Sequence, residues 1–420
     1  MKATTIIHTI KTMYTPFHQP PVKGSNMTEI RQIEEAYIAI KDDRILAVGQ
    51  GSYAHLMTSD TKLYDAQGAI AIPGLIDPHT HLVHAGSREH EVEDLHKGVP
   101  YLEILNQGGG ILGTVQKTKS ADEKELYDQA TRSLDLLMEQ GVTAIEAKSG
   151  YGLDLESELK QLRVAKALQE THPIHLTSTY MGAHAIPPFF KDRPDAFVDQ
   201  IILDLNTIKS QGLANAVDVF CETGVFSIEQ TQRILTEAKK LGFFIKLHAD
   251  EIHPLGGAGL GVQLGAVSAD HLMAISDQDI AALASSDTVA TVLPGTSFFL
   301  RKGYAPARKM LNQGCALSIS TDYNPGSSPS EAFQLMMQIA FTQLLMTPEE
   351  ILHASTINPA YQLRLHHEMG SLDVGKKANI VLMNAPNLTY VMYHYGINHT
   401  QDVFIDGKHV IQSKHCRRLS

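Results

Sequence analysis

Two histidines separated by one residue, His79 and His81, are the side chains whose type and spacing best suit metal binding. They close an apolar segment that follows Pro73-Gly74, and a spacing of two places both imidazoles on the same face of a β-strand. Such a pair also arises by chance or as packed core histidines. It therefore indicates a metal only when further ligands accompany it.

Other apolar segments end in residues of the same chemistry. They end in His248-Ala249-Asp250-Glu251, in Asp270-His271 and in Thr321-Asp322. Taken singly, His271 could be a hydrogen-bonded core histidine, and Asp322 could be a helix cap. Imidazoles with one carboxylate suit zinc or iron, and fewer than six protein ligands leave room for water. Because such residues recur at the ends of several apolar segments, the sequence predicts a metal centre.

A metal centre of this kind predicts hydrolysis. A bound metal can bring the pKa of its water to about 7, and hydrolysis of an amide also requires protonation of the leaving nitrogen. Glu251 and His271 are the candidates for that proton transfer. Asp322 is placed both to contact the metal and to accept the proton of the water.

Short apolar strands that alternate with amphipathic helices must position these residues. Segments such as 156–169 and 227–242 repeat apolar residues at intervals of three and four, as helices do. Eight strand candidates fall at residues 75–81, 142–150, 174–184, 216–224, 243–251, 264–271, 288–295 and 316–326. Eight such units predict a (β/α)8 TIM-type barrel, whose active site lies at the carboxyl ends of the strands.

The two ends of the chain have a different pattern. The first seventy residues are rich in β-strand segments, with a turn at Asp42-Asp43, and segments 370–385 and 403–411 are strand-like again. We expect residues 1–70 and 368–420 to form one small β-sandwich that flanks a barrel of residues 71–367.

The composition of the chain limits the kinds of molecule and compartment that suit this protein. The 420-residue chain has a net charge of −11 and no basic stripe, which argues against nucleic acid. An anionic substrate would therefore need a local cationic side chain. No apolar run approaches the roughly 20 residues of a membrane helix, and the N-terminus lacks the features of a signal peptide. Three scattered cysteines, one of them Cys416, indicate a reducing cytoplasm.

Several motifs together resemble the amidohydrolase superfamily, and within it the cyclic amidases that act on imidazolone propionate. They are DPHTHLVHAGSRE (77–89), AKSGYGL (147–153), STYMGAHAIPP (178–188), HADEIHPLGG (248–257), SADHL (268–272), STDYNPGSSP (320–329) and YHYGINH (393–399). The resemblance runs essentially end to end. It implies hydrolysis of the cyclic C–N bond to give N-formimino-L-glutamate, in histidine degradation.

The resemblance also implies a set of site residues and a homodimer. The implied metal ligands are His79, His81, His248 and Asp322. The implied substrate contacts are Arg88, Tyr151, His184, Glu251, Asn324, Gly326 and Ser327.

Most of these substrate residues also have an ordinary structural explanation. The Arg88 guanidinium matches a carboxylate bidentately, as a propionate tail requires, but a surface ion pair with Glu89 would also explain it. Tyr151 lies between two glycines, where a packed loop aromatic is the alternative. His184 could be a hydrogen-bonded loop histidine. The segment 324–328 could be a turn before a helix.

The fourth predicted strand, 216–224, determines the expected number of metals. Binuclear members of the superfamily bridge two metals through a modified lysine on that strand, and this strand has no lysine. Lys148 lies on the second strand, where we expect a structural role. The hypothesis is one metal ion per subunit, with zinc and iron both compatible. His84 departs from the family pattern and is expected to be exposed.

Two other functions remain as alternatives. Another mononuclear amidohydrolase, such as a cytosine- or guanine-type deaminase, would share the metal ligands but would not require Arg88. A non-catalytic scaffold with the same fold would be expected to have lost metal ligands, and all four are retained.

Overall fold

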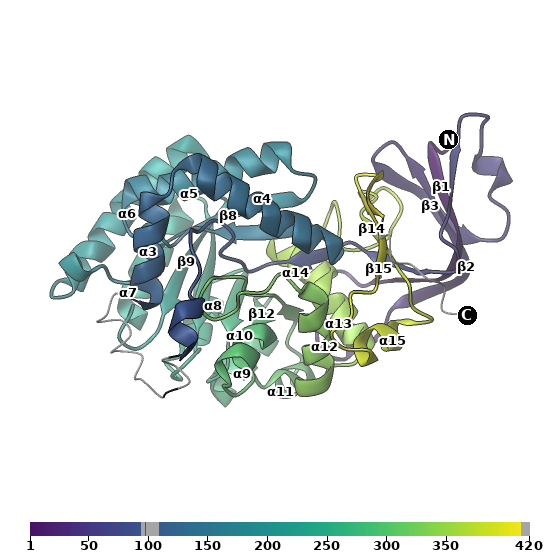
Figure 1. Ribbon diagram of the computed structural model, residues 1–420. Helices are drawn as coiled ribbons and strands as arrows, with labels where there is room; N and C mark the ends of the chain where they lie inside the picture. Colours follow the sequence, from purple (N-terminus) through teal and green to yellow (C-terminus); the bar gives the residue numbers. More distant parts are fainter. Residues whose placement is uncertain (94–96, 98–108, 413–420) are drawn as a thin grey trace.

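The computed structural model describes residues 1–93, 97 and 109–412 (Figure 1). Cys416 and the last eight residues of the predicted C-terminal segment lie outside the described residues. The described chain forms two sheets, one surrounded by helices and one built from both ends of the chain.

The first sheet confirms the barrel prediction. Its eight parallel strands follow one another in chain order: β6 (Leu75–Asp77), β7 (Val142–Lys148), β8 (His175–Ala183), β9 (Ala216–Cys221), β10 (Phe244–Ala249), β11 (Ser268–His271), β12 (Val289–Val292) and β13 (Leu317–Ile319). Each strand is almost entirely buried, as expected for strands covered on both faces.

Residues just beyond the strand ends complete the closure of the barrel. Thr80, after β6, forms a parallel bridge with Tyr323, after β13. The backbone N–H of His81 donates to the Tyr323 carbonyl at 2.8 Å. The first and last strands therefore meet at the level of the predicted metal ligands.

Helices surround this sheet (Figure 1). They are α3 (Gly110–Ser120), α4 (Glu123–Glu139), α5 (Leu155–Thr171), α6 (Pro194–Gln211), α7 (Ile228–Lys240), α8 (Gly257–Leu264), α9 (Asp277–Ala284), α10 (Pro294–Leu300), α11 (Ala307–Asn312), α12 (Phe333–Gln343), α13 (Pro348–Ser355) and α14 (Ile357–Gln362). Several start at strong N-caps, including capping boxes that begin at Asp122, Ser227 and Thr347. None of the helices among the described residues has the length and apolar character needed to cross a bilayer.

The second sheet combines the two ends of the chain, as predicted. Its strands are β1 (Thr5–Thr15), β2 (Arg31–Lys41), β3 (Arg44–Gln50), β4 (Lys62–Asp65), β5 (Ile70–Pro73), β14 (Ile380–Met383), β15 (Thr400–Ile405) and β16 (Lys408–Gln412). The strand order is β16-β15-β14-β5-β1-β2-β3, and β4 pairs with β1 in parallel. The antiparallel β14–β5 pair joins the C-terminal strands to the N-terminal ones. Between β14 and β15 lies α15 (Leu388–Tyr393).

Strand β14 has a different partner on each face. Ile380 and Leu382 belong to the core of the second sheet, whereas Val381 and Met383 belong to the large core cluster of the barrel. This alternation follows from the two-residue period of a strand. The second sheet therefore packs against the barrel through one face of β14.

Candidate functional site

The histidine pair lies directly beyond β6, and that strand is fixed by Asp77. The Asp77 carboxylate accepts hydrogen bonds from the Ser320 hydroxyl and, at 2.6 Å, from the Thr321 hydroxyl at the end of β13. Because these bonds tie the first strand to the last, they set the position from which His79 and His81 extend into the barrel.

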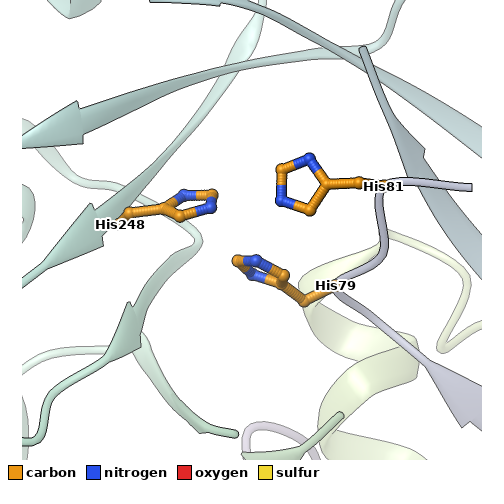
Figure 2. Close-up of side chains that lie close together, drawn as sticks. All are labelled: His79, His81 and His248. Carbon is orange, nitrogen blue, oxygen red and sulfur yellow. The ribbon is translucent and has the colours of Figure 1, made fainter. Parts of the chain in front are cut away.

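Three imidazoles converge at this end of the barrel (Figure 2). His79 and His81 come from the chain after β6, and His248 comes from β10. The ring centroids of His79 and His248 are 4.4 Å apart, and those of His81 and His248 are 5.6 Å apart. One ligand atom from each ring lies within 4.8 Å of the others, a spacing that one metal ion can span.

Asp322 brings a carboxylate to the same point. Its Oδ1 lies 3.5 Å from His79 Nε2 and 3.9 Å from His81 Nε2. Its Oδ2 accepts a hydrogen bond from the Thr296 hydroxyl at 2.6 Å. The backbone of Asp322 is left-handed, with φ of 52°, which is uncommon for a non-glycine residue and typical of functional sites.

The unsatisfied ring nitrogens fit a metal. His79 Nδ1 lies 2.6 Å from Asp270 Oδ2, and His248 Nδ1 lies 3.0 Å from Asp218 Oδ1. Since ionised carboxylates only accept hydrogen bonds, both Nδ1 atoms must donate, which leaves each Nε2 with a lone pair. Within the described part of the chain, neither buried Nε2 has a hydrogen-bond partner.

The electrostatic environment keeps the imidazoles of His79 and His81 neutral. Burial, followed by the positive charge of Lys148, lowers the pKa of His79 well below its ordinary value. Burial likewise lowers the pKa of His81. A neutral imidazole is the form that ligates metal, so both side chains are in the required state at neutral pH.

His271 and Glu251 form the side of the site nearest to β11. His271 Nδ1 lies 3.6 Å from Glu251 Oε2, and the ring centroid of His271 lies 4.9 Å from that of His248. Burial and the charge of Asp322 raise the pKa of Glu251 to about 7. Burial lowers the pKa of His271 well below its ordinary value. The pair thus combines a carboxyl that can hold a proton at neutral pH with an uncharged imidazole.

Tyr151 and His184 lie against the metal-site histidines. The His184 ring stacks on His81 with centroids 4.8 Å apart, and the Tyr151 ring lies 5.6 Å from His81. His184 Nδ1 is 3.0 Å from the carbonyl oxygen of Gly150, which fixes the ring. The structure therefore brings both predicted substrate residues to the predicted metal ligands.

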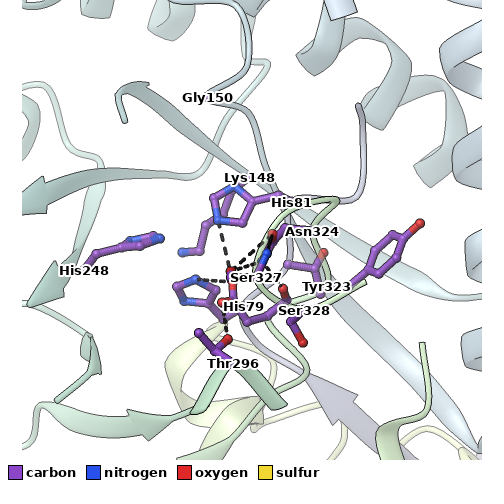
Figure 3. A network of polar contacts seen from close by, with 12 residues as sticks. His79, His81, Lys148, Gly150, His248, Thr296, Tyr323, Asn324, Ser327 and Ser328 are labelled. Carbon is purple, nitrogen blue, oxygen red and sulfur yellow. Dashed lines mark hydrogen bonds and ion pairs between the residues drawn. The ribbon is translucent and has the colours of Figure 1, made fainter. Parts of the chain in front are cut away.

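The turn after β13 carries the predicted substrate residues Asn324 and Ser327 (Figure 3), with Gly326 between them. Asn324 Nδ2 donates to the Asp322 carbonyl at 2.6 Å, and Asn324 Oδ1 accepts from the backbone N–H groups of Gly326 and Ser327. A Cβ at position 326 would come within 2.1 Å of Arg88 Nη1, so a larger residue there would displace the guanidinium. Arg88 thus lies against the turn.

Arg88 is not the exposed partner of Glu89 that the simplest explanation required. Its Nε and Nη2 donate to Glu91 Oε2 at 3.0 and 2.9 Å, and both side chains are largely buried. Glu91 in turn accepts from the backbone N–H of Gly110 at 2.7 Å. These contacts orient the guanidinium toward Gly326.

The expectation that His84 is exposed is wrong. The preceding Leu82 and Val83 pack in the barrel core and carry His84 inside with them. His84 Nδ1 lies 2.9 Å from the His81 carbonyl oxygen, and its ring packs 5.5 Å from that of Tyr323. Burial lowers the pKa of His84 to about 4.

Sequence reasoning missed a group of charged residues beneath the predicted metal ligands. Lys148 was expected to be structural, but its buried partners Glu146, Asp218, Asp270 and Lys246 were not identified as a group. A usable signal was present, because these charges interrupt otherwise apolar strands. The pairs Glu146/Lys148 and Lys246/His248 are each two residues apart and so share a face.

Comparison with known proteins identifies a set of close relatives. The model of the amidohydrolase family matches residues 206–410. An imidazolonepropionase from Alkaliphilus oremlandii is 51% identical over 399 residues, which cover 94% of each chain. An imidazolonepropionase from Bacillus velezensis is 48% identical over 409 residues, which cover 97% of each chain.

Solved structures share the fold at much lower identity. An adenosine deaminase from Xanthomonas campestris with bound zinc superimposes with a TM-score of 0.73 at 16% identity, covering 100% of this chain and 95% of that one. The guanine deaminase of E. coli has a TM-score of 0.73 at 14% identity, covering 97% and 99%. At these identities the likeness extends to the fold and not to the substrate.

Proposed function

The chain belongs to the imidazolonepropionase family of the amidohydrolases, and from that premise we propose how its residues open the substrate ring. It is a metal-dependent hydrolase that cleaves the cyclic C–N bond of imidazolone propionate with water, giving N-formimino-L-glutamate in histidine degradation. The observation that carries the proposed site is the convergence of His79, His81 and His248 on one point beside Asp322.

We assign His79, His81, His248 and Asp322 as the ligands of a single zinc or iron ion. The unsatisfied Nε2 atoms of His79 and His248 support this assignment, as does the mixed imidazole and carboxylate donor set. Strand β9 has no lysine that could bridge a second ion. When bound, the ion would lower the pKa of a water molecule to about 7.

Two side chains carry the proton transfers, and a third binds the carbonyl oxygen of the substrate. Asp322 takes the proton of the attacking water, because it lies beside the metal-binding nitrogens. Glu251 donates a proton to the ring nitrogen as the C–N bond breaks, since its pKa of about 7 keeps much of it protonated at neutral pH. His271 is uncharged and donates a hydrogen bond to the carbonyl oxygen, where negative charge develops.

Arg88 and the turn after β13 recognise the anionic group of the substrate. Arg88 binds the propionate carboxylate, with Asn324, Gly326 and Ser327 beside it, in a protein whose net charge of −11 otherwise repels anions. Tyr151 and His184, with Glu251, contact the imidazolone ring. The close approach of Arg88 Nη1 to Gly326 supports this grouping.

The test combines metal analysis with a direct assay. The purified protein is expected to contain about one zinc or iron ion per chain and to accelerate the loss of the ring absorbance of imidazolone propionate. Removing the metal with a chelator should abolish the acceleration, and adding it back should restore it. Cytosine and guanine serve as comparison substrates. Deamination of either base without ring opening would overturn the proposal.

The Arg88→Ala variant tests how the carboxylate is bound. Losing a hydrogen bond to a charged group costs roughly 1.5–3 kcal/mol, so KM should rise about tenfold to a hundredfold while kcat changes little. Arg163→Ala is the control, because Arg163 pairs with Glu123 and Glu156 on the surface. An unchanged KM in Arg88→Ala would contradict the assigned role.

We also propose that the enzyme works in the cytoplasm as a homodimer. Cys221 and Cys315 are both free and buried, as is usual in a reducing compartment. Tyr393, Tyr395 and Ile397 expose much of their apolar surface on one short segment, which suits burial against a second copy. Light scattering on the purified protein measures the mass directly.

A further inference from the structure

Five buried charged side chains lie beneath the metal-binding imidazoles, and we call them the charged cluster. The cluster consists of three carboxylates and two ammonium groups: Glu146, Asp218, Asp270, Lys148 and Lys246. They come from β7, β9, β10 and β11, and each is at most 1% exposed. Burying so many charges is costly unless each is paired, and the proposed reaction uses none of them directly.

Two members of the charged cluster touch metal ligands. Asp218 Oδ1 lies 3.0 Å from His248 Nδ1 and accepts the backbone N–H of His248 at 3.2 Å. Asp270 Oδ2 lies 2.6 Å from His79 Nδ1. Both carboxylates thereby select the ring orientation that turns Nε2 toward the metal position.

The two lysines differ in which carboxylates they hold. Lys148 Nζ lies 2.5 Å from Asp218, 2.9 Å from Glu146 and 3.7 Å from Asp270, so it bridges both of the carboxylates that orient ligands. Lys246 Nζ is bound to Glu146 at 2.6 Å and to the Pro78 carbonyl at 2.8 Å, and it approaches Asp270 only at 3.9 Å.

The carboxylates around Lys148 keep its side chain charged. Burial alone would lower the pKa of Lys148, but Asp218 and Glu146 raise it above its ordinary value, so the ammonium remains charged. Lys148 is therefore a firmly held ammonium group in contact with Asp218.

We infer that Lys148 is a positioning residue, which holds the Asp218 and Asp270 carboxylates so that His248 and His79 present Nε2 to one metal ion. The inference rests on the metal site proposed above and adds to it the source of the ligand orientation. Without the Lys148 ammonium, Asp218 and Asp270 would be close anions with less to fix them. Changes to groups that orient ligands typically weaken metal binding about 10–100-fold.

Lys148→Met and Lys246→Met form a matched pair for the test. Both substitutions remove one buried ammonium and keep an unbranched side chain, so a general structural effect should lower the melting temperature of the metal-free protein in both. Zinc affinity is measured by competition with a chelator. We expect the Kd for zinc to rise about 10–100-fold in Lys148→Met and less than about threefold in Lys246→Met.

Equal zinc affinities in the two variants, or no loss in Lys148→Met, would overturn the inference. If Lys148→Met does not fold, Lys148→Gln removes the same positive charge but keeps a polar side chain in the buried cluster. An unchanged zinc Kd in Lys148→Gln then overturns the inference. Failure of the underlying metal site has a separate signature, since the unmodified protein would then bind no stoichiometric zinc or iron.

Discussion

At the scale of single residues, Glu251 is the group whose ionisation controls the proposed chemistry at neutral pH. Burial and the neighbouring Asp322 disfavour its charged form and raise its pKa to about 7. The carboxyl is therefore protonated below that pH and ionised above it. As a proton donor to the leaving nitrogen, Glu251 contributes most below about pH 7, and its contribution disappears as the pH rises.

Replacing Glu251 with glutamine gives a specific prediction. The wild-type kcat/KM should fall as the pH rises through about 7, whereas Glu251→Gln should lose this falling limb together with about 100- to 10,000-fold of the rate. The measurement is the pH profile of ring opening for both proteins at equal metal content. A falling limb with the same midpoint in Glu251→Gln would assign the ionisation to another group.

Single residues also show where prediction from sequence succeeds and where it stops. The positions of the histidines after β6 and on β10, with His271 and Asp322, at strand ends predicted a metal centre, because strand ends of a barrel meet at one edge. The choice of His248 and Asp322 as ligands rather than His271 rested on the family resemblance. The contacts of Asp218 and Lys148 depend on which side chains face one another across the barrel. Local periodicity does not contain that information.

At the scale of elements, helix α5 fixes the loop that carries Tyr151. The Glu158 carboxylate accepts the backbone N–H groups of Gly150 at 2.9 Å, Gly152 at 2.7 Å and Leu153 at 2.8 Å. Gln161, one turn later, accepts the N–H of Tyr151 at 3.2 Å. The carbonyl oxygen of Gly150 also accepts a hydrogen bond from His184 Nδ1. One helix thus orients two proposed substrate contacts.

Glu158→Gln tests this element. The amide replaces one acceptor oxygen with a donor that faces backbone N–H groups, at a cost of roughly 1.5–3 kcal/mol, so the loop should lose its fixed position. We expect KM to rise about tenfold or more, with metal content unchanged. Glu156→Gln on the exposed face of α5 is the control and should match the wild type. A fall in metal content with unchanged KM would contradict the loop role.

The strands and the main helices were predictable because their periodicity and capping residues are local. The role of Glu158 was not, since the segment from Glu156 to Gln161 is polar enough to suggest a helix face in water. Its burial depends on the loop after β7 folding back over it. Polar residues that serve as backbone caps for another element leave no trace in a hydrophobic pattern.

At the scale of the whole molecule, the pattern at the chain ends predicted that they share a sheet, but not how that sheet attaches to the barrel. The attachment depends on β14, whose alternate residues enter two separate cores. Gly74 alone separates β5 from β6, and a Cβ there would lie 2.1 Å from the Thr143 hydroxyl oxygen. The two sheets are therefore linked tightly both along the chain and through packing.

This linkage predicts that sheet and barrel unfold together. Leu382 faces the core of the second sheet and Met383 faces that of the barrel, and both are fully buried. Leu382→Ala and Met383→Ala should each lower the free energy of unfolding by roughly 2–5 kcal/mol, because each leaves a cavity. In urea, circular dichroism should show a single transition for both variants. Hydrogen exchange should accelerate in the strands of both sheets for either variant. Acceleration confined to the second sheet in Leu382→Ala would show that the two parts unfold independently.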